Sequence, residues 1–161
     1  MMWRNAAACL LVSSLFSACD GENHPIGWGQ PLDASPAAAS RIVPQTIVLT
    51  PVTGVHCPFL TPFTSTFDVV INPGSRDLFL DQVTLRLSDG SSVGGSPVLM
   101  SSADLTARLA STRIRAGTTN RFELSPRFGC GGFLPRAMHA DIVLRDGSGV
   151  MHTTSLVVPI G

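Results

Sequence analysis

Short runs of β-forming residues recur throughout residues 46–161, and they constrain the fold of this chain more than any other feature. The runs are rich in Val, Ile, Thr, Leu and Phe, and Pro, Gly, Asn and Asp separate them. This pattern is typical of antiparallel sandwiches and barrels. It predicts strands at 46–52, 64–71, 79–88, 97–101, 112–115, 120–124, 137–145 and 150–159. A competing pattern at 102–110 predicts a helical turn capped by Ser102.

Alternation within the runs predicts which face of each strand is buried. Phe67, Val69 and Ile71 face one way, and the run 83–87 alternates in the same manner. One apolar face per strand is expected when two antiparallel sheets pack against each other.

The last two strands form a hairpin whose register the sequence predicts. A three-residue loop at 147–149, with Gly149 as the left-handed residue, gathers most large apolar side chains on one face, whereas a two-residue loop splits them. The predicted pairs are Asp146 with Val150, Leu144 with His152, Ile142 with Thr154, Ala140 with Leu156, and Met138 with Val158.

The N-terminal residues have the layout of a secretory signal. Arg4 precedes a short apolar run from Ala6, which ends in Ser17, Ala18 and Cys19. The run is shorter than the roughly 20 apolar residues that span a bilayer. Residues 15–19 resemble the lipobox of bacterial lipoproteins, although Phe16 stands where those proteins usually have Leu. The resemblance implies that Cys19 receives a diacylglycerol, becomes the mature N-terminus and anchors the protein to a membrane.

These patterns divide the chain into three parts. Residues 1–18 are expected to be a lipoprotein signal peptide. Residues 19–45 are expected to be the lipidated Cys19 and a flexible, Pro- and Ala-rich tether, because they lack sustained apolar periodicity. Residues 46–161 are expected to form one β domain.

Two cysteines remain once Cys9 leaves with the signal and Cys19 takes lipid. In an oxidising envelope, Cys57 and Cys130 are expected to form a disulfide. The alternative is metal ligation with His56 beside Cys57. Zinc needs a fourth ligand, and no CxxC or HxxxH spacing supplies one.

Strand number and spacing at 46–161 resemble an immunoglobulin-like or fibronectin-III-like β-sandwich of about 7–8 strands. The chain departs from antibody domains because it has no core Trp and because its cysteines fall outside the strand centres. In the topology that this resemblance implies, the connections carrying Cys57 and Cys130 lie at the same end of the sandwich. The disulfide is therefore expected to join loops instead of crossing the core.

Charge and motif content exclude several function classes. Eleven basic and eleven acidic residues give a formal net charge of zero, so nothing indicates nucleic-acid binding.

Two soft-donor pairs suggest copper: Met138 with His139, and Met151 with His152. The bulged register, however, points His139 and His152 to opposite faces of the hairpin. A hydrolase is a third reading, based on His139 and Asp141, but no Gly-x-Ser-x-Gly turn accompanies them.

The predicted function is a non-enzymatic, lipid-anchored protein of the bacterial cell envelope, facing the periplasm or the exterior. It is expected to bind another envelope protein or to support an assembly, without a cofactor. The alternative is an exported copper-handling sandwich module that uses His139 or His152 with Met.

Overall fold

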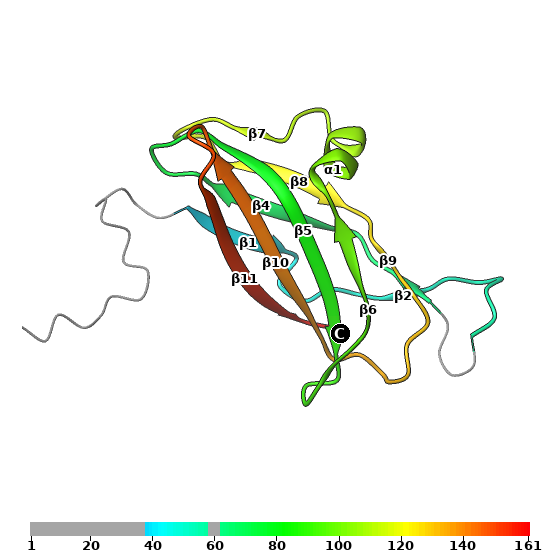
Figure 1. The fold of residues 1–161 in the computed structure, drawn as a ribbon. Coiled ribbons are helices and arrows are strands. Elements are labelled where there is room, and N and C mark those ends of the chain that lie inside the picture. The colour runs from blue at the N-terminus through cyan, green and yellow to red at the C-terminus, as the bar shows by residue number, and fades with distance from the viewer. Residues whose placement is uncertain (1–37, 58–61) are drawn as a thin grey trace, which may run out of the picture. The chain divides into compact units, whose positions relative to one another are not determined.

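The computed structural model describes residues 38–57 and 62–161, and almost all of their regular structure is antiparallel β (Figure 1). The strands are β1 (Ala39–Val43), β2 (Thr50–Pro51), β3 (Phe63–Thr64), β4 (Phe67–Asn72), β5 (Leu78–Ser88), β6 (Val93–Met100), β7 (Arg113–Ile114), β8 (Asn120–Leu124), β9 (Arg127–Phe128), β10 (Ala137–Asp146) and β11 (Met151–Pro159). One helix, α1 (Ser102–Arg108), follows β6. The signal segment 1–18 and Cys19 lie outside the described residues.

Two sheets form the body of the domain. One has the order β1-β4-β8, and the other has the order β11-β10-β5-β6 with β7 added to β5. Figure 1 shows them as two layers, and a single apolar core contains buried side chains from both. A third, small sheet, β2-β3-β9, lies at one end of the domain. The all-β, sandwich-like prediction is confirmed.

The core is built from the alternating positions that the sequence predicts. Phe67, Val69 and Ile71 are buried in β4, and Val83 and Leu85 are buried in β5. They meet Ile142 and Leu144 of β10 within the same cluster. Removal of these side chains from water supplies the main driving force for bringing the two sheets together.

The C-terminal hairpin has the predicted register. Met138 pairs with Val158, Ala140 with Leu156, Ile142 with Thr154, and Leu144 with His152. The Asp146 amide donates to the Val150 carbonyl at 3.0 Å, and Gly149 has a φ of +90°. Glycine suits that position because a side chain strains the left-handed backbone.

Helix α1 confirms the competing helical prediction at 102–110, with its cap one residue earlier than expected. Ser101 is the N-cap, and its hydroxyl and the Asp104 side chain form a capping box. The Leu105 side chain is buried in the core. Capping and one apolar contact therefore hold this single short helix in a β domain.

The predicted boundary between tether and domain is wrong at its C-terminal end. Residues Ala39–Val43, assigned to the tether at 19–45, form β1 and pair with β4 from Asn72 to Asp68. Ile42 enters the core with 4% of its surface exposed. The five residues carry only this one fully buried position, so their own periodicity is too weak to predict a strand. Pairing with β4 decides it.

Other strand limits also differ from the predictions. The expected strand at 46–52 is reduced to β2, although Ile47 is fully buried and its amide donates to the Pro159 carbonyl. The sixth strand begins at Val93 instead of 97, and β9 was not predicted. Hairpin pairing of Val93 with Ser88 sets the start of β6, and pairing with β3 makes β9 a strand.

Two leucines on adjacent strands test the assignment of core and surface. Leu85 is fully buried, whereas Leu99 on β6 is 57% exposed. We expect Leu85→Ala to lower the free energy of unfolding by about 2–5 kcal/mol because it leaves a cavity. Leu99→Ala is expected to change it by less than about 0.5 kcal/mol. Urea denaturation of both variants measures the difference, and equal effects would contradict the assigned layering.

Candidate functional site

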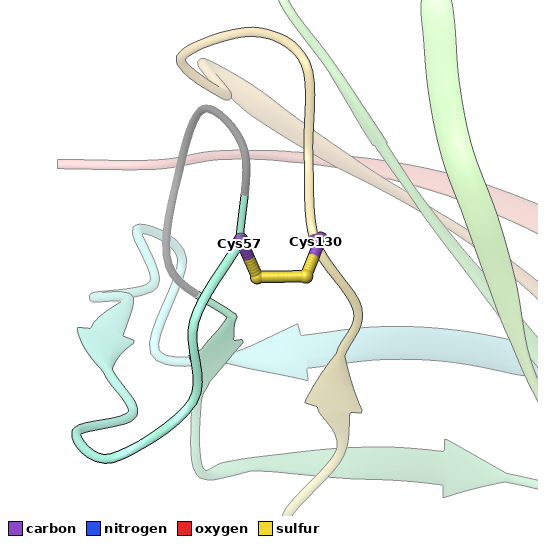
Figure 2. The surroundings of a disulfide bond; sticks show 2 residues. All are labelled: Cys57 and Cys130. Carbon is purple, nitrogen blue, oxygen red and sulfur yellow. A yellow bond between two sulfur atoms is a disulfide. The ribbon is translucent and has the colours of Figure 1, made fainter.

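A disulfide joins Cys57 and Cys130 at the end of the domain that carries the small sheet (Figure 2). It is the pairing expected from the sequence. The residues are 73 positions apart, and their Cα atoms are 5.7 Å apart. Cys57 lies between β2 and β3, and Cys130 follows β9, so the bond links two loops and does not cross the core.

The small sheet aligns the two segments that carry the cysteines. Phe63 of β3 pairs with Phe128 of β9, and the Thr64 hydroxyl donates to the Pro126 carbonyl at 2.9 Å. Phe128 is buried, and Phe63 packs against the core. These contacts hold β3 and β9 together independently of the disulfide. The bond therefore stabilises an arrangement that packing already favours.

A shallow apolar recess lies beside the disulfide. Phe63, Phe128 and Phe133 line it together with Leu87 and Pro135. Its enclosed volume is about 20 Å³, room for roughly one water molecule. Small-molecule sites are usually several hundred Å³, so this recess is too small to hold a substrate or cofactor.

Glycine at position 94 allows the loop after β9 to pack on β6. A Cβ atom at Gly94 would collide with the Phe133 ring. The Arg136 amide also donates to the Ser88 carbonyl at 2.7 Å, which holds the same loop at the end of β5. The loop after β9 is therefore fixed at both of its ends, by Cys130 and by Arg136.

The turn between β5 and β6 lies at this same end and is ordered by one carboxylate. Asp89 accepts hydrogen bonds from the Ser91 and Ser92 amides, each at 2.8 Å. These amides, Ser92 first, lower the pKa of Asp89 to about 2. The turn places Val93, which is 52% exposed, close to Gly94 and the recess.

Three exposed aliphatic side chains belong to the segments that meet here. They are Val55 from the loop after β2, Val93 from the start of β6, and Leu134 from the loop after β9; Leu134 is 69% exposed. We call these residues and the recess the stapled end. Binding residues are often found on loops that a rigid scaffold holds in place.

The pair His139 and Asp141, considered for hydrolysis, lies on the outer face of the five-stranded sheet. The Asp141 carboxylate accepts from the Ser155 hydroxyl at 2.6 Å and from Arg86 at 2.7 Å. Ser155 first, and then Arg86, lower the pKa of Asp141. His139 instead bonds the hydroxyl of buried Ser88 at 3.0 Å. These bonds form a ladder across β11, β10 and β5, and neither oxygen of Asp141 orients His139 as a catalytic base requires.

The two Met-His pairs considered for copper are divided between the faces of the hairpin. Met138 is fully buried, and Met151 is 52% exposed. His139 pairs across β10 and β11 with Val157, whereas His152 pairs with Leu144 and contacts Asp146 at 3.4 Å. Within residues 38–57 and 62–161, no three His, Cys, Asp or Glu side chains gather as metal ligands.

The arginines near β7 and β8 are largely engaged within the domain. Arg113 pairs with Asp77 at 2.6 Å, and Arg121 pairs with Asp68 at 2.5 Å. The Ala116 amide, followed by Arg113, lowers the pKa of Asp77. Arg113 is thus already paired, and Arg115 is exposed.

Asp146 organises the hairpin loop, a role that sequence reasoning did not assign. Its carboxylate accepts from the Ser148 hydroxyl at 2.6 Å and from the Ser148 and Val150 amides, each at 2.9 Å. The Ser148 hydroxyl is the main cause that holds the pKa of Asp146 far below its ordinary value. The sequence signal was the Asp-Gly-Ser-Gly turn, in which an aspartate side chain bonds the amides that follow it.

No protein-family model matches the chain, and no curated protein matches it. Two solved structures show likeness at 10% sequence identity. The structural genomics target SoR45 has a TM-score of 0.48 over 76% of this chain and 86% of its own. The putative ApaA protein from Bordetella pertussis has a TM-score of 0.40 over 77% of this chain and 95% of its own.

The described residues contain no helix long and apolar enough to cross a membrane.

Removal of the disulfide is expected to lower stability substantially. The bond closes a loop across a separation of 73 residues. In the chain-entropy model this contributes about 4 kcal/mol. The variant Cys57→Ser with Cys130→Ser should therefore unfold at a lower urea concentration, and its free energy of unfolding should be lower by about 4 kcal/mol. Unchanged stability, with the same value before and after reduction of the wild type, would contradict a structural bond.

The stability contributed by Asp146 is expected to depend on pH. Because its pKa in the folded state lies below the ordinary 3.8, the ionised carboxylate stabilises the fold above that pH. This contribution disappears as the pH falls through the lower, folded-state value. We expect Asp146→Asn to unfold more easily than wild type at neutral pH, and the gap to shrink below pH 3.8. A gap that stays constant in denaturation series across this range would contradict the assignment.

Proposed function

We propose that this chain is a lipid-anchored protein of a bacterial cell envelope that binds another envelope protein through the stapled end. The observation that carries the proposal is the Cys57–Cys130 bond. Structural disulfides persist in oxidising compartments such as the periplasm and the cell surface, and are rare in the cytosol. Such a compartment agrees with a signal at 1–18 and a lipid on Cys19.

The anchor and the domain have separate roles in this proposal. The residues from Arg4 to Cys19 supply export and acylation, with two or three acyl chains holding the protein on a membrane. Residues 20–38 then connect the lipid to β1. The domain faces the periplasm or the exterior and acts without a cofactor.

We also propose that the sandwich is of the immunoglobulin-like, fibronectin-III-like type. The orders β1-β4-β8 and β11-β10-β5-β6 correspond to A-B-E and G-F-C-C′ in the immunoglobulin lettering. The connection between the first two of these strands carries Cys57, and the connection before β10 carries Cys130. In this lettering the stapled end carries the A-B, C-C′ and E-F connections, and the loops that form antibody binding sites, B-C, C′-C″ and F-G, lie at the opposite end.

The stapled end has the composition of a small protein-binding surface. Val93 and Leu134 present aliphatic groups to solvent, and both are next in sequence to residues that line the apolar recess. The disulfide and the Asp89 turn order these segments in advance, which lowers the entropy lost on binding. A protein partner that offers exposed aliphatic or aromatic side chains fits this surface.

The first test is the intact mass of the protein purified from its native membrane. We expect a chain that begins at Cys19, carries added acyl groups and has no free thiol before reduction. An unacylated mass would overturn the anchor, and two free thiols would overturn the compartment argument. Neither result depends on partner binding.

The binding site is tested separately with a photo-crosslinking residue at position 93 in cells. We expect a discrete crosslinked partner that disappears with Leu134→Asp and persists with Leu99→Asp. The two leucines are similarly exposed, at 69% and 57%, but only Leu134 belongs to the stapled end. Loss of the partner with both variants, or with neither, would contradict the assigned surface.

A further inference from the structure

Strand β11 forms an open edge of the five-stranded sheet. Its residues Met151–Pro159 pair with β10, and the order β11-β10-β5-β6 leaves the other side of the strand outermost. The Asp146 amide bonds the Val150 carbonyl, and the Ile160 amide bonds the Arg136 carbonyl. In an antiparallel pair the hydrogen-bonded positions alternate, so the even-numbered residues between them point their backbone groups at β10.

The odd-numbered residues of β11 therefore direct their amides and carbonyls away from the sheet. They are Met151, Thr153, Ser155 and Val157. Pro159 is not among them, because its carbonyl already accepts from the Ile47 amide at 3.0 Å. In the part of the chain that the structure describes, the amides and carbonyls of these four residues have no hydrogen-bond partner on that open side. Such an edge is a template for another strand.

The other edges of the two large sheets carry features that prevent strand addition. Exposed Arg121 and Glu123 lie on β8, and β6 contains Pro97 and a register shift opposite β5. Strand β1 has only five residues and includes exposed Arg41. In contrast, β11 runs for nine residues without a charged side chain and has proline only at its last position. Charge, proline and short length are the usual guards of an edge.

The open edge is complementary to itself. If two copies of β11 run antiparallel with Thr154 at the centre, Met151 lies opposite Val157 of the second copy, and Thr153 lies opposite Ser155 of the second copy. Apolar side chains then meet apolar side chains, and hydroxyls meet hydroxyls. Met151 and Val157 are 52% and 62% exposed, so both have surface to bury. Cross-strand pairs of these kinds stabilise antiparallel sheets.

We propose that two copies of this chain join through their β11 edges, with a two-fold axis at Thr154. The odd-numbered backbone groups of each copy then pair with those of the other, and one continuous sheet contains β11, β10, β5 and β6 from both copies. A strand without Asp, Glu, Lys or Arg meets its copy without charge repulsion. Two-fold pairing uses both open edges, so the assembly ends at a dimer.

The test compares two charge variants that change the same positions. In the proposed register, Met151→Glu with Val157→Lys places opposite charges across the two-fold axis at both ends of the interface. Met151→Glu with Val157→Glu places like charges there. Both side chains are exposed, and the hydrogen bond between Ser155 and Asp141 is untouched, so both variants are expected to fold. Circular dichroism and thermal unfolding verify this.

We expect the full chain, purified from membranes in detergent, to sediment as a dimer. The Glu/Lys variant should remain a dimer, and the Glu/Glu variant should raise the dimer dissociation constant by about 10-fold or more. A monomeric wild type overturns the proposal. If the β11 amides of that monomer are protected from hydrogen exchange, another segment of the same chain pairs with the β11 edge. A dimer that neither variant alters, or that both disrupt, overturns the β11 interface or its register.

Discussion

Antiparallel pairing between β5 and β10 is the interaction on which the other elements of the domain depend. These are the two longest strands, and they pair from Leu78 with Asp146 to Ser88 with Ala137. Their inner faces supply Leu80, Leu85, Ile142 and Leu144 to the core, all fully buried. Their free sides receive β6, β7 and β11, so a fault in this one ladder would displace both edges of the sheet.

The outer face of the same ladder is polar, and its polar groups are paired along the strands. Arg86 and Ser155 bind Asp141, while Arg145 contacts Asp81 at 3.2 Å and lies over the Phe79 ring at 5.1 Å. Each exposed pair contributes little stability alone. Together they keep this face polar, whereas exposed aliphatic side chains at the stapled end and outward-facing backbone groups at the edge of β11 reach solvent.

Local sequence rules predicted the elements whose conformation depends on neighbours in the chain. Turn chemistry at Gly149 and apolar alternation were enough to derive the whole register from Met138 to Val158. They failed at β1 and β9, where a few residues become strands only because β4 and β3 lie beside them. The candidate site was likewise predicted only in part. Cysteine counting paired Cys57 with Cys130, but the recess around Phe133 and the turn held by Asp89 come from packing of segments far apart in sequence.

The sequence by itself determined the all-β class, the final hairpin and the cysteine pair, because period-two alternation, turn residues and an even thiol count are properties of short stretches. Only the tertiary structure decided that Ala39–Val43 belongs to a sheet and that Asp141 is bound by Arg86. It also decided that β11 lies at an edge. An edge differs from a central strand only by the absence of a neighbour, and strand order follows from long-range burial of both sheets in one core. No local pattern records that information.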